Sequence, residues 1–356
     1  MTRVLHIIDG TISRDAAWQL ELLVAEGDDM VSVDPPPAWW PAHLPARSEH
    51  VPLGMASLCG RRLTAVAWRA DIVHAWSLRA AEAAAEAARG AVRPGVVSLP
   101  CVPTGHDLRR ALNAPGFAGL HLTVPTRSAR AALLEAGGFD DRIHVLPAPA
   151  RVPDDTAERR RRIRAELGVS DDEALVVAPG EMTHTAGHMY ASWAHAIVRH
   201  IRPGLRLLLP GGGAAFRHVR FFAGTTGFDE EVFLPGERVG LDDALAAADV
   251  ATFFAERDNG TAALVRALAS GVAVTACRTR DVCELTDDGR AALLVRRRMP
   301  RDYASAVLEL VENSARRKAL VAEGLTVAGE HAPERCRRAL EAIYEAAAGV
   351  RCGLNA

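Results

Sequence analysis

The clearest pattern along the chain is a short apolar run, then a polar turn, then an amphipathic segment, repeated many times. The stretch 248–276 shows it best, because 250–254 is apolar, 256–260 is a polar turn and 261–269 has helical periodicity. A glycine then ends the helix and a second apolar run follows at 272–275. Short apolar runs of this kind are typical of strands buried on both faces of a parallel sheet. The stretch therefore predicts a strand–loop–helix–strand unit of an open α/β sheet.

The same alternation continues from end to end and predicts two successive α/β domains. Strands are expected at 3–9, 70–77, 96–101, 120–124, 142–149, 174–178, 205–209, 232–236, 250–254, 272–275 and 292–295. Helices are expected at 15–26, 79–89, 128–134, 158–167, 241–247, 261–269, 302–312, 315–328 and 333–347. A Pro- and Asp-rich stretch at 149–155 suits a linker between the two sets. The length of 356 residues agrees with two domains at roughly 100–200 residues each.

Composition and charge exclude several classes of protein. Apolar residues make up 49% of the chain, and no run approaches the roughly 20 apolar residues that cross a bilayer. The formal net charge of −2 argues against a nucleic-acid partner. The chain enters an apolar strand directly from its first residues, so no signal peptide is expected. A cytoplasmic protein is the expectation.

Cysteine and lysine usage narrows the chemistry further. None of the six cysteines forms a Cys-x-x-Cys pair, which favours buried free thiols over a disulfide framework or a zinc site. Lys318 is the only lysine, so a P-loop nucleotidase is excluded. His184 and His188 have a possible metal spacing, but Gly187 weakens a helix between them and no third ligand is indicated, so no metal is expected.

The stretch 248–276 also resembles a known site. Residues 266–274, Arg-Ala-Leu-Ala-Ser-Gly-Val-Ala-Val, match the second half of the pattern E-G-F-G-x-x-x-x-E-A-M-A-x-G-x-P-V. That pattern marks the nucleotide-sugar site of retaining glycosyltransferases of the GT-B fold, family 4. In the family the second Glu holds the ribose hydroxyls, and here Arg266 takes its place. The first Glu corresponds to Asp258, a catalytic candidate, with Glu256 nearby as a shifted substitute.

The first half of the chain resembles the same family in outline. Residues 70–77 are similar to its p-D-i-v-H-a-H-s strand, and 120–149 are similar to the segment that ends its first domain. The first loop, 10–16, lacks the family's glycine pair. Pro100 stands where the family has a histidine close to the sugar. His106 follows six residues later as a displaced catalytic candidate or, alternatively, as a loop histidine that caps the next helix.

The resemblance implies an α/β architecture of the GT-B type. This fold has two Rossmann-like domains that face a central cleft, with parallel sheets and helices on both faces of each. We expect an acceptor-side domain at 1–150 and a nucleotide-sugar-side domain at 151–332. The C-terminal helix, within 333–356, is expected to cross back to the first domain.

The donor-site loops carry further departures from the family. Residues 179–188 resemble v-G-R-l-x-x-x-K-G, whose Arg and Lys clamp the donor diphosphate, but Glu181 and Ala186 stand at those positions. Two unit charges about 4 Å apart interact by roughly 4 kcal/mol at an effective dielectric constant of 20. A Glu in place of an Arg should therefore strongly weaken the binding of a diphosphate. The family has a cation at position 181 and a carboxylate at position 266, and this chain has the opposite charges there. One hypothesis is therefore an internal ion pair between Arg266 and Glu181. The donor-binding candidates are Gly180, Glu181, Gly211, Gly212, Glu256, Asn259, Gly260, Thr261 and Arg266.

Three functions stay open at this point. The first is an active transferase that binds a nucleotide sugar and a glycan acceptor, with no other cofactor, and that uses other arginines (Arg217, Arg257, Arg266 or Arg278) for the diphosphate. The second is a non-catalytic relative that partners an active glycosyltransferase in a glycan or cell-envelope pathway. The third is an enzyme for another substrate, in which Arg266 pairs with an acidic ligand. A location at the inner face of the membrane suits such a pathway.

Two further patterns have ordinary structural interpretations beside functional ones. Adjacent Trp39 and Trp40 in a proline-rich loop can stack on a sugar or partner, but we expect a loop folded over the sheet edge. The arginine run at 159–164 can bind phosphate or an acidic membrane, but we expect a solvated helix face.

Overall fold

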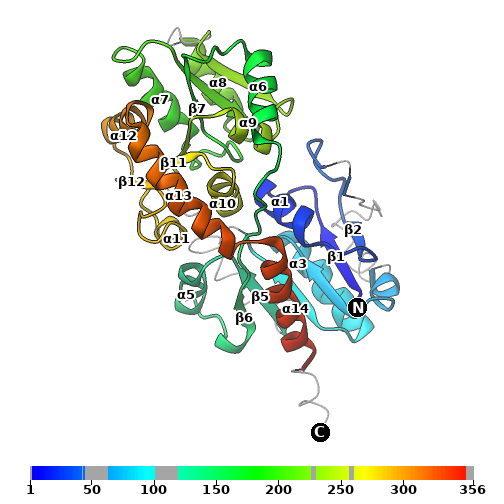
Figure 1. Cartoon of the computed structure of the whole chain (residues 1–356). Coiled ribbons are helices and arrows are strands. Elements are labelled where there is room, and N and C mark those ends of the chain that lie inside the picture. Colours follow the sequence, from blue (N-terminus) through cyan, green and yellow to red (C-terminus); the bar gives the residue numbers. More distant parts are fainter. Residues whose placement is uncertain are drawn as a thin grey trace. The chain divides into compact units, whose positions relative to one another are not determined.

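The computed structural model describes residues 2–41, 43–44, 63–100, 119–225, 230–255 and 260–349 (Figure 1). The chain divides into two compact units, one of Met1–Ala148 with Pro333–Ala356 and one of Pro149–Ala332. Each unit contains a six-stranded sheet, and all strand pairs in both sheets are parallel. The prediction of two α/β units with parallel sheets is confirmed.

The first unit has the strand order β2-β1-β3-β4-β5-β6. Its elements are β1 (Val4–Ile8), α1 (Arg14–Leu23), β2 (Asp29–Ser32), β3 (Ile72–Ala75), α3 (Leu78–Ala91), β4 (Gly95–Ser98), β5 (Leu120–Val124), α5 (Arg127–Glu135), η3 (Asp140–Arg142), β6 (Ile143–Val145) and α14 (Pro333–Gly349). The last helix of the chain, α14, packs against α1.

Alternation along β1 decides which helices cover each face of this sheet. Leu5 and Ile7 join one core with the alanine side of α3, whereas Val4 and Ile8 join a second core with α1 and α14. Successive side chains of a strand point to opposite faces of the sheet. A strand with apolar residues facing both ways therefore requires helices on both sides, as observed.

Buried polar side chains connect the middle of this sheet to α14. His74 Nδ1 lies 2.7 Å from the Tyr344 hydroxyl, and His74 Nε2 lies 2.8 Å from Ser98 Oγ. Burial lowers the pKa of His74 well below its usual value. The ring is therefore neutral, with one nitrogen donating and the other accepting. It links β3 to β4 and to the C-terminal helix.

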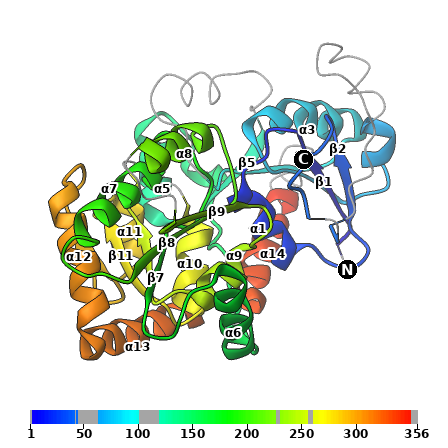
Figure 2. The same ribbon diagram turned by 90° about the horizontal axis from the view of Figure 1, so that it is seen from above.

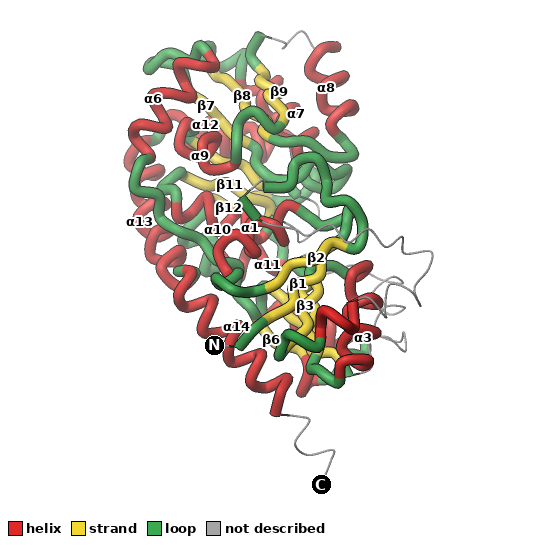
Figure 3. The backbone as a smooth tube through the Cα atoms, turned by 90° about the vertical axis from the view of Figure 1, so that its right-hand side faces the viewer, coloured by secondary structure: helices red, strands yellow, loops and turns green. Residues whose placement is uncertain are grey.

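The second unit has the strand order β12-β11-β10-β7-β8-β9 (Figure 3). Its strands are β7 (Ala174–Val177), β8 (Leu205–Pro210), β9 (Val232–Gly236), β10 (Val250–Phe253), β11 (Ala273–Cys277) and β12 (Leu293–Val295). Its helices are α6 (Thr156–Leu167), α7 (His188–Val198), α8 (Phe216–Thr225), α9 (Leu241–Ala247), α10 (Thr261–Ala269), α11 (Arg280–Leu285), α12 (Pro300–Glu312) and α13 (Ser314–Glu330). Helices α7 and α12 pack together, as do α6 with α9 and α10 with α13 (Figure 2).

The arginine run on α6 is a solvated face only in part, because Arg161 and Arg162 are exposed but Arg164 is buried. Arg164 is 3% exposed and donates to the carbonyls of Ser170 and Glu173. Arg160 donates to the carbonyls of Ala247 and Ala248, at the end of α9, both at 2.9 Å. Cations are favoured at a helix C-terminus, where the last carbonyls have no partner within the helix. These two arginines therefore join α6 to α9.

The tryptophan pair and the cysteines can be placed in part. Trp39 and Trp40 are partly buried against the core that contains α1, and the Arg14 guanidinium lies 4.5 Å from the Trp39 ring centroid.

Among the described residues, the free thiols Cys277 and Cys336 are buried and Cys283 is half-buried. The remaining cysteines, Cys59, Cys101 and Cys352, lie outside the described residues.

Candidate functional site

The order of strands in the second unit places the candidate site. Strands β8 and β9 add to one side of β7, and β10, β11 and β12 add to the other side. In open parallel sheets, ligands bind outside the carboxyl ends of the strands at such a switch point. Here β7 and β10 lead into the glycine-containing segments 178–187 and 254–260, of which 256–259 lie outside the described residues. The candidate site is therefore the carboxyl edge of β7, β8 and β10.

Backbone hydrogen bonds join the loops that follow β7 and β8. The Met182 amide donates to the Gly212 carbonyl at 3.0 Å, and the Ala215 amide donates to the Met182 carbonyl at 2.7 Å. A Cβ on Gly213 would stand 2.6 Å from the Met182 carbonyl oxygen, so the approach requires glycine. The amides of Gly212 and Gly213 donate no hydrogen bond to a described residue, and Gly213 is exposed. The junction thus presents two backbone donors at the carboxyl edge.

The start of α7 packs closely against the end of β10. A Cβ on Gly187 would lie 2.3 Å from the carbonyl carbon of Phe254. His188, the first residue of α7, is 2% exposed, and neither ring nitrogen has a hydrogen-bond partner. Burial lowers the pKa of His188 to about 4, against the opposing influence of the carbonyls of Ala178 and Gly180. The ring is therefore neutral at pH 7 and brings no positive charge to the site.

The hypothesis of an ion pair between Arg266 and Glu181 is wrong. Arg266 Nη2 lies 2.7 Å from Asp242 Oδ2, and Arg266 Nε lies 3.1 Å from Asp242 Oδ1. No ion pair joins Arg266 to Glu181, although both residues are described. Asp242 is in the first turn of α9, where a carboxylate is also stabilised by the helix N-terminus. The neighbouring helix, rather than the loop after β7, supplies the counter-charge.

The predicted site residues that the structure describes lie along one edge. Gly180 and Glu181 follow β7, and Gly211 and Gly212 follow β8. Gly260 and Thr261 stand at the start of α10, and Arg266 lies in the second turn of that helix. The other candidates, His106, Glu256, Asp258 and Asn259, are outside the described residues. Sequence reasoning missed Asp242 and Met182, and it considered His188 only as a possible metal ligand. An acidic first turn was the signal for Asp242, but that feature is common to many helices.

The helix starts of the two units differ at their carboxyl edges. In the first unit, α1, α3 and α5 are capped by the side-chain oxygens of Ser13, Ser77 and Thr126. In the second unit, α7 and α10 begin after Gly187 and Gly260, which have no capping side chain. A glycine N-cap leaves room for a ligand to approach the helix start. The starts of α7 and α10 are therefore open to a ligand, whereas α11 of the same unit is capped by the Thr279 side chain.

A metal centre finds no support in the described part of the chain. No group of three or more His, Cys, Asp or Glu side chains there is placed to hold a metal ion. The His184 ring faces His218 instead, with centroids 5.7 Å apart in an edge-on arrangement.

Solved structures define the class of fold. The chain is similar to HepE of Anabaena, solved in complex with UDP-glucose, with a TM-score of 0.83 and 16% identity over 97% of this chain and 100% of that one. It is also similar to WaaG, a glycosyltransferase involved in lipopolysaccharide biosynthesis, with a TM-score of 0.71 and 15% identity over 94% of this chain and 98% of that one. These likenesses establish the GT-B fold.

Two sequence matches show similarity to glycosyltransferases over part of the chain. Residues 173–313, most of the second unit, match the family model described as glycosyl transferases group 1. The D-inositol 3-phosphate glycosyltransferase of Corynebacterium kroppenstedtii is 30% identical over 213 residues, which are 56% of this chain and 47% of that relative. The match thus spans about half the length of the relative. The chain thus has the GT-B fold, and its second unit is similar to group 1 glycosyl transferases.

Proposed function

We propose that the protein transfers a sugar from a nucleotide-sugar donor to a glycan acceptor, and that the donor diphosphate binds at the carboxyl edge of the second unit. The junction of the β7 and β8 loops carries this proposal, because it holds the Gly212 and Gly213 amides at the switch point of the sheet. Backbone amides of this kind bind phosphate oxygens. The complex of HepE with UDP-glucose supports a UDP-sugar donor. By resemblance, the transfer retains the configuration at the sugar carbon.

Arg217 is the cation that we assign to the diphosphate. Arg266 is paired with Asp242, and Arg278 Nη1 lies 2.6 Å from Asp288 Oδ1. Arg217 is exposed in the first turn of α8, four residues after Gly213, and has no ion-pair partner in the described ranges. A cation beside the leaving diphosphate stabilises the charge that develops during transfer.

A second candidate is a non-catalytic subunit that binds a ligand or an active glycosyltransferase. The observation that favours it is the pair of changes in the β7 loop, where Glu181 and Ala186 stand at the positions of the family's two cations. A carboxylate there repels a bound diphosphate. Only a measurement of sugar transfer distinguishes this non-catalytic subunit from an active transferase.

The proposal also includes a cytoplasmic location at the inner face of a membrane. Among the described residues, no helix is long and apolar enough to cross a bilayer.

Calorimetric titration with UDP-, GDP- and ADP-sugars, with and without Mg²⁺, tests the donor proposal. We expect one UDP-sugar to bind in the micromolar range, about −8 kcal/mol. Arg217→Gln should weaken that binding about tenfold, whereas Arg220→Gln, an exposed arginine on the same helix, should not. Release of UDP with candidate acceptors then distinguishes the enzyme from the non-catalytic subunit. Absence of binding by every nucleotide sugar rejects the proposal.

A further inference from the structure

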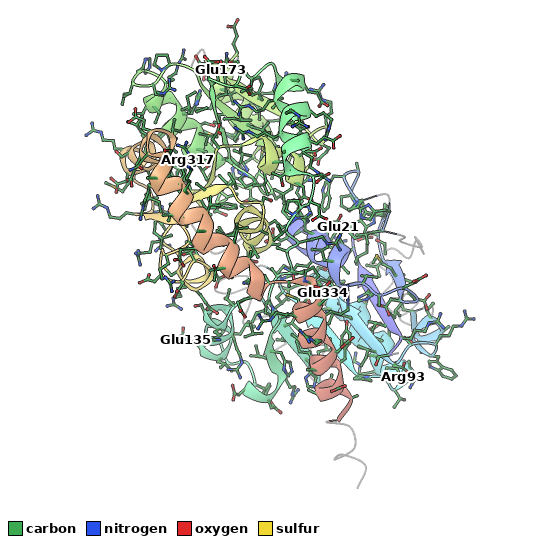
Figure 4. All side chains as sticks on the ribbon, in the orientation of Figure 1. Glu21, Arg93, Glu135, Glu173, Arg317 and Glu334 are labelled. Atoms are coloured by element: carbon green, nitrogen blue, oxygen red, sulfur yellow. The ribbon has the colours of Figure 1, made fainter. Side chains whose placement is uncertain are left out.

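A cavity of about 740 Å³ lies in the first unit, at the amino edge of its sheet. It is lined by the first residues of β1, by the turn that follows α1 and by one face of α14. Glu21 on α1 and Glu334 on α14 mark these two helices in Figure 4. Ligands of open parallel sheets usually bind at the carboxyl edge, so the cavity is at the opposite edge from such a site. Its volume is within the range of about 300–1,000 Å³ that is usual for small-molecule sites.

The residues of α14 at this cavity belong to one face of the helix. They recur at intervals of three and four residues, as Arg337, Leu340, Glu341, Tyr344 and Glu345. Leu340 and Tyr344 are buried in the core that contains α1, whereas both glutamates are exposed. The cavity therefore has apolar walls and a charged rim.

One carboxylate that lines the cavity is itself buried. The Asp28 side chain is 7% exposed and accepts hydrogen bonds from the amides of Val4 and Ala25, both at 3.0 Å. His6 Nε2 lies 3.3 Å from Asp28 Oδ2, and His6 Nδ1 lies 3.0 Å from the Trp76 indole nitrogen. Because an indole N–H can only donate, Nδ1 accepts, and the proton of the neutral ring is on Nε2. His6 therefore donates to Asp28 without cancelling its charge.

Asp28 is a carboxylate at neutral pH. Burial raises its pKa, but the hydrogen bonds from His6 and from the amides of Ala25 and Val4 lower it below its usual value. Burial also raises the pKa of Tyr344 well above its usual value, and the charge of Asp28 adds to that effect. No arginine pairs with Asp28 in the described part of the chain. The cavity thus contains a buried negative charge without a cationic partner there.

The rim of the cavity adds further negative charge. Glu26 comes from the turn after α1, and Glu341 and Glu345 are four residues apart on α14. Like charges at this spacing repel each other across one helical turn. None of these three glutamates forms an ion pair with a residue that the structure describes, although Arg337 and Arg338 are three and four residues before Glu341. A bound cation would relieve this repulsion.

The two arginines that line the cavity have other partners. Arg3 Nη2 lies 2.9 Å from Asp29 Oδ2, and the Arg3 amide donates to the Asp71 carboxylate. Arg337 Nη2 donates at 3.0 Å to the Leu22 carbonyl at the end of α1, where carbonyls have no partner within the helix. Carboxylates therefore outnumber guanidinium groups around the cavity, and Asp29 and Asp71 increase that excess.

We propose that this cavity binds an aliphatic polyamine, a molecule with two or more ammonium groups joined by methylene chains. One ammonium group would lie against Asp28, and another would lie beside Glu341 and Glu345. The methylene chain between them would lie against Leu23 and Leu340. Hydrogen bonds between an ammonium group and a carboxylate are strong when the carboxylate is buried, and apolar walls favour a methylene chain. The inference does not depend on the proposed sugar transfer.

The test is calorimetric titration of the whole chain with spermidine at constant ionic strength. We expect a Kd of about 10–100 μM, and binding of the monoamine hexylamine should be at least about tenfold weaker. Glu341→Gln and Glu345→Gln should each weaken spermidine binding about threefold, and the double variant should weaken it about tenfold. Asp28 also holds the turn between α1 and β2, so the rim glutamates are the better positions to change. Without ligand, the variants should have a Tm equal to or above that of the wild type, because the repulsion on α14 is removed.

Glu82→Gln is the matched control, because Glu82 is an exposed glutamate on α3 of the same unit that does not line the cavity. It should leave spermidine binding unchanged. The inference is wrong if the wild type does not bind spermidine at millimolar concentration, or if the rim variants bind it no more weakly than Glu82→Gln does. Equal affinity for hexylamine and spermidine would also overturn it, because one ammonium group would then suffice. Nucleotide-sugar titration is a separate measurement, so failure of one proposal does not affect the other.

Discussion

The guanidinium of Arg266 and the carboxylate of Asp242 form a two-point ion pair between the second turn of α10 and the first turn of α9, at 2.7 and 3.1 Å. Arg266 is 9% exposed, whereas 39% of the Asp242 side chain is exposed. The parallel geometry is the strong form of an arginine–carboxylate contact. The pair neutralises Arg266 locally and turns a carboxylate toward the edge where the donor is proposed to bind.

The two single substitutions that break this ion pair are expected to lower stability by different amounts. Asp242→Asn removes a carboxylate partner from a nearly buried guanidinium and should lower the free energy of unfolding by about 2 kcal/mol. Arg266→Met removes the buried charge itself and should cost about half as much, because Asp242 can remain hydrated. Urea unfolding of both variants and of the double variant measures this. Equal costs for the two single changes would contradict the burial argument.

The contact between Gly187 and Phe254 predicts a large effect from one methyl group. Gly187→Ala places a Cβ 2.3 Å from the carbonyl carbon of Phe254, directly after β10, and should destabilise the second unit by about 3 kcal/mol or more. Gly168→Ala is the control, since Gly168 has a similar left-handed φ of 66° but no atom within 4 Å of the added Cβ. It should cost about 1 kcal/mol. Thermal unfolding compares the stability of the two variants. Similar losses of stability would show that the left-handed backbone conformation, rather than the contact with Phe254, is responsible.

His188 predicts acid sensitivity with a definite sign. Its pKa is about 4 in the folded chain and about 6.5 when unfolded, so below pH 6.5 the unfolded state binds the extra proton. Stability should therefore fall as pH decreases from 6.5 to 4, by up to about 3 kcal/mol from this residue. His188→Leu should reduce the slope, and His200→Gln, at an exposed position, should leave it unchanged. Denaturant midpoints at several pH values give the slopes; an unaltered slope in His188→Leu would exclude this origin.

The hydrogen bonds of His74 predict coupling between the sheet and the C-terminal helix. Tyr344→Phe and Ser98→Ala each leave one buried imidazole nitrogen unsatisfied and should each cost about 1–2 kcal/mol. The double variant should differ from the sum of the two, because both partners set the tautomer of one ring. Strict additivity in a double-mutant cycle would show that the two bonds are independent.

Local patterns predicted most elements of the fold, but not strand β2 or helices α7 and α11. The bounds expected for β5, β9, α9 and α10 agree with the structure, because each is a continuous apolar or periodic run with a clear stop. Strand β2 was not predicted, since Asp29–Ser32 mixes polar and apolar residues. Its strand conformation follows from pairing with β1, which is a tertiary interaction.

The candidate site was predictable as a location but not in its contacts. Glycines after apolar runs placed the loops, because strand ends and helix starts are encoded locally. The partners of Arg266 and Arg164 lie on other elements, Asp242 on α9 and backbone carbonyls after α6, and sequence spacing does not report such contacts. For this reason the solvated-face expectation for α6 is wrong for Arg164, although Arg161 and Arg162 are exposed as expected.

Titration of UDP-glucose into the wild type and into Glu181→Arg tests the central claim most directly, namely that the carboxyl edge of the second unit is a donor-diphosphate site. Exchange of a carboxylate for a cation beside the diphosphate should tighten binding at least about tenfold, and Glu181→Gln should give an intermediate gain. If neither the wild type nor Glu181→Arg binds UDP-glucose or any other nucleotide sugar, the edge is not a donor site.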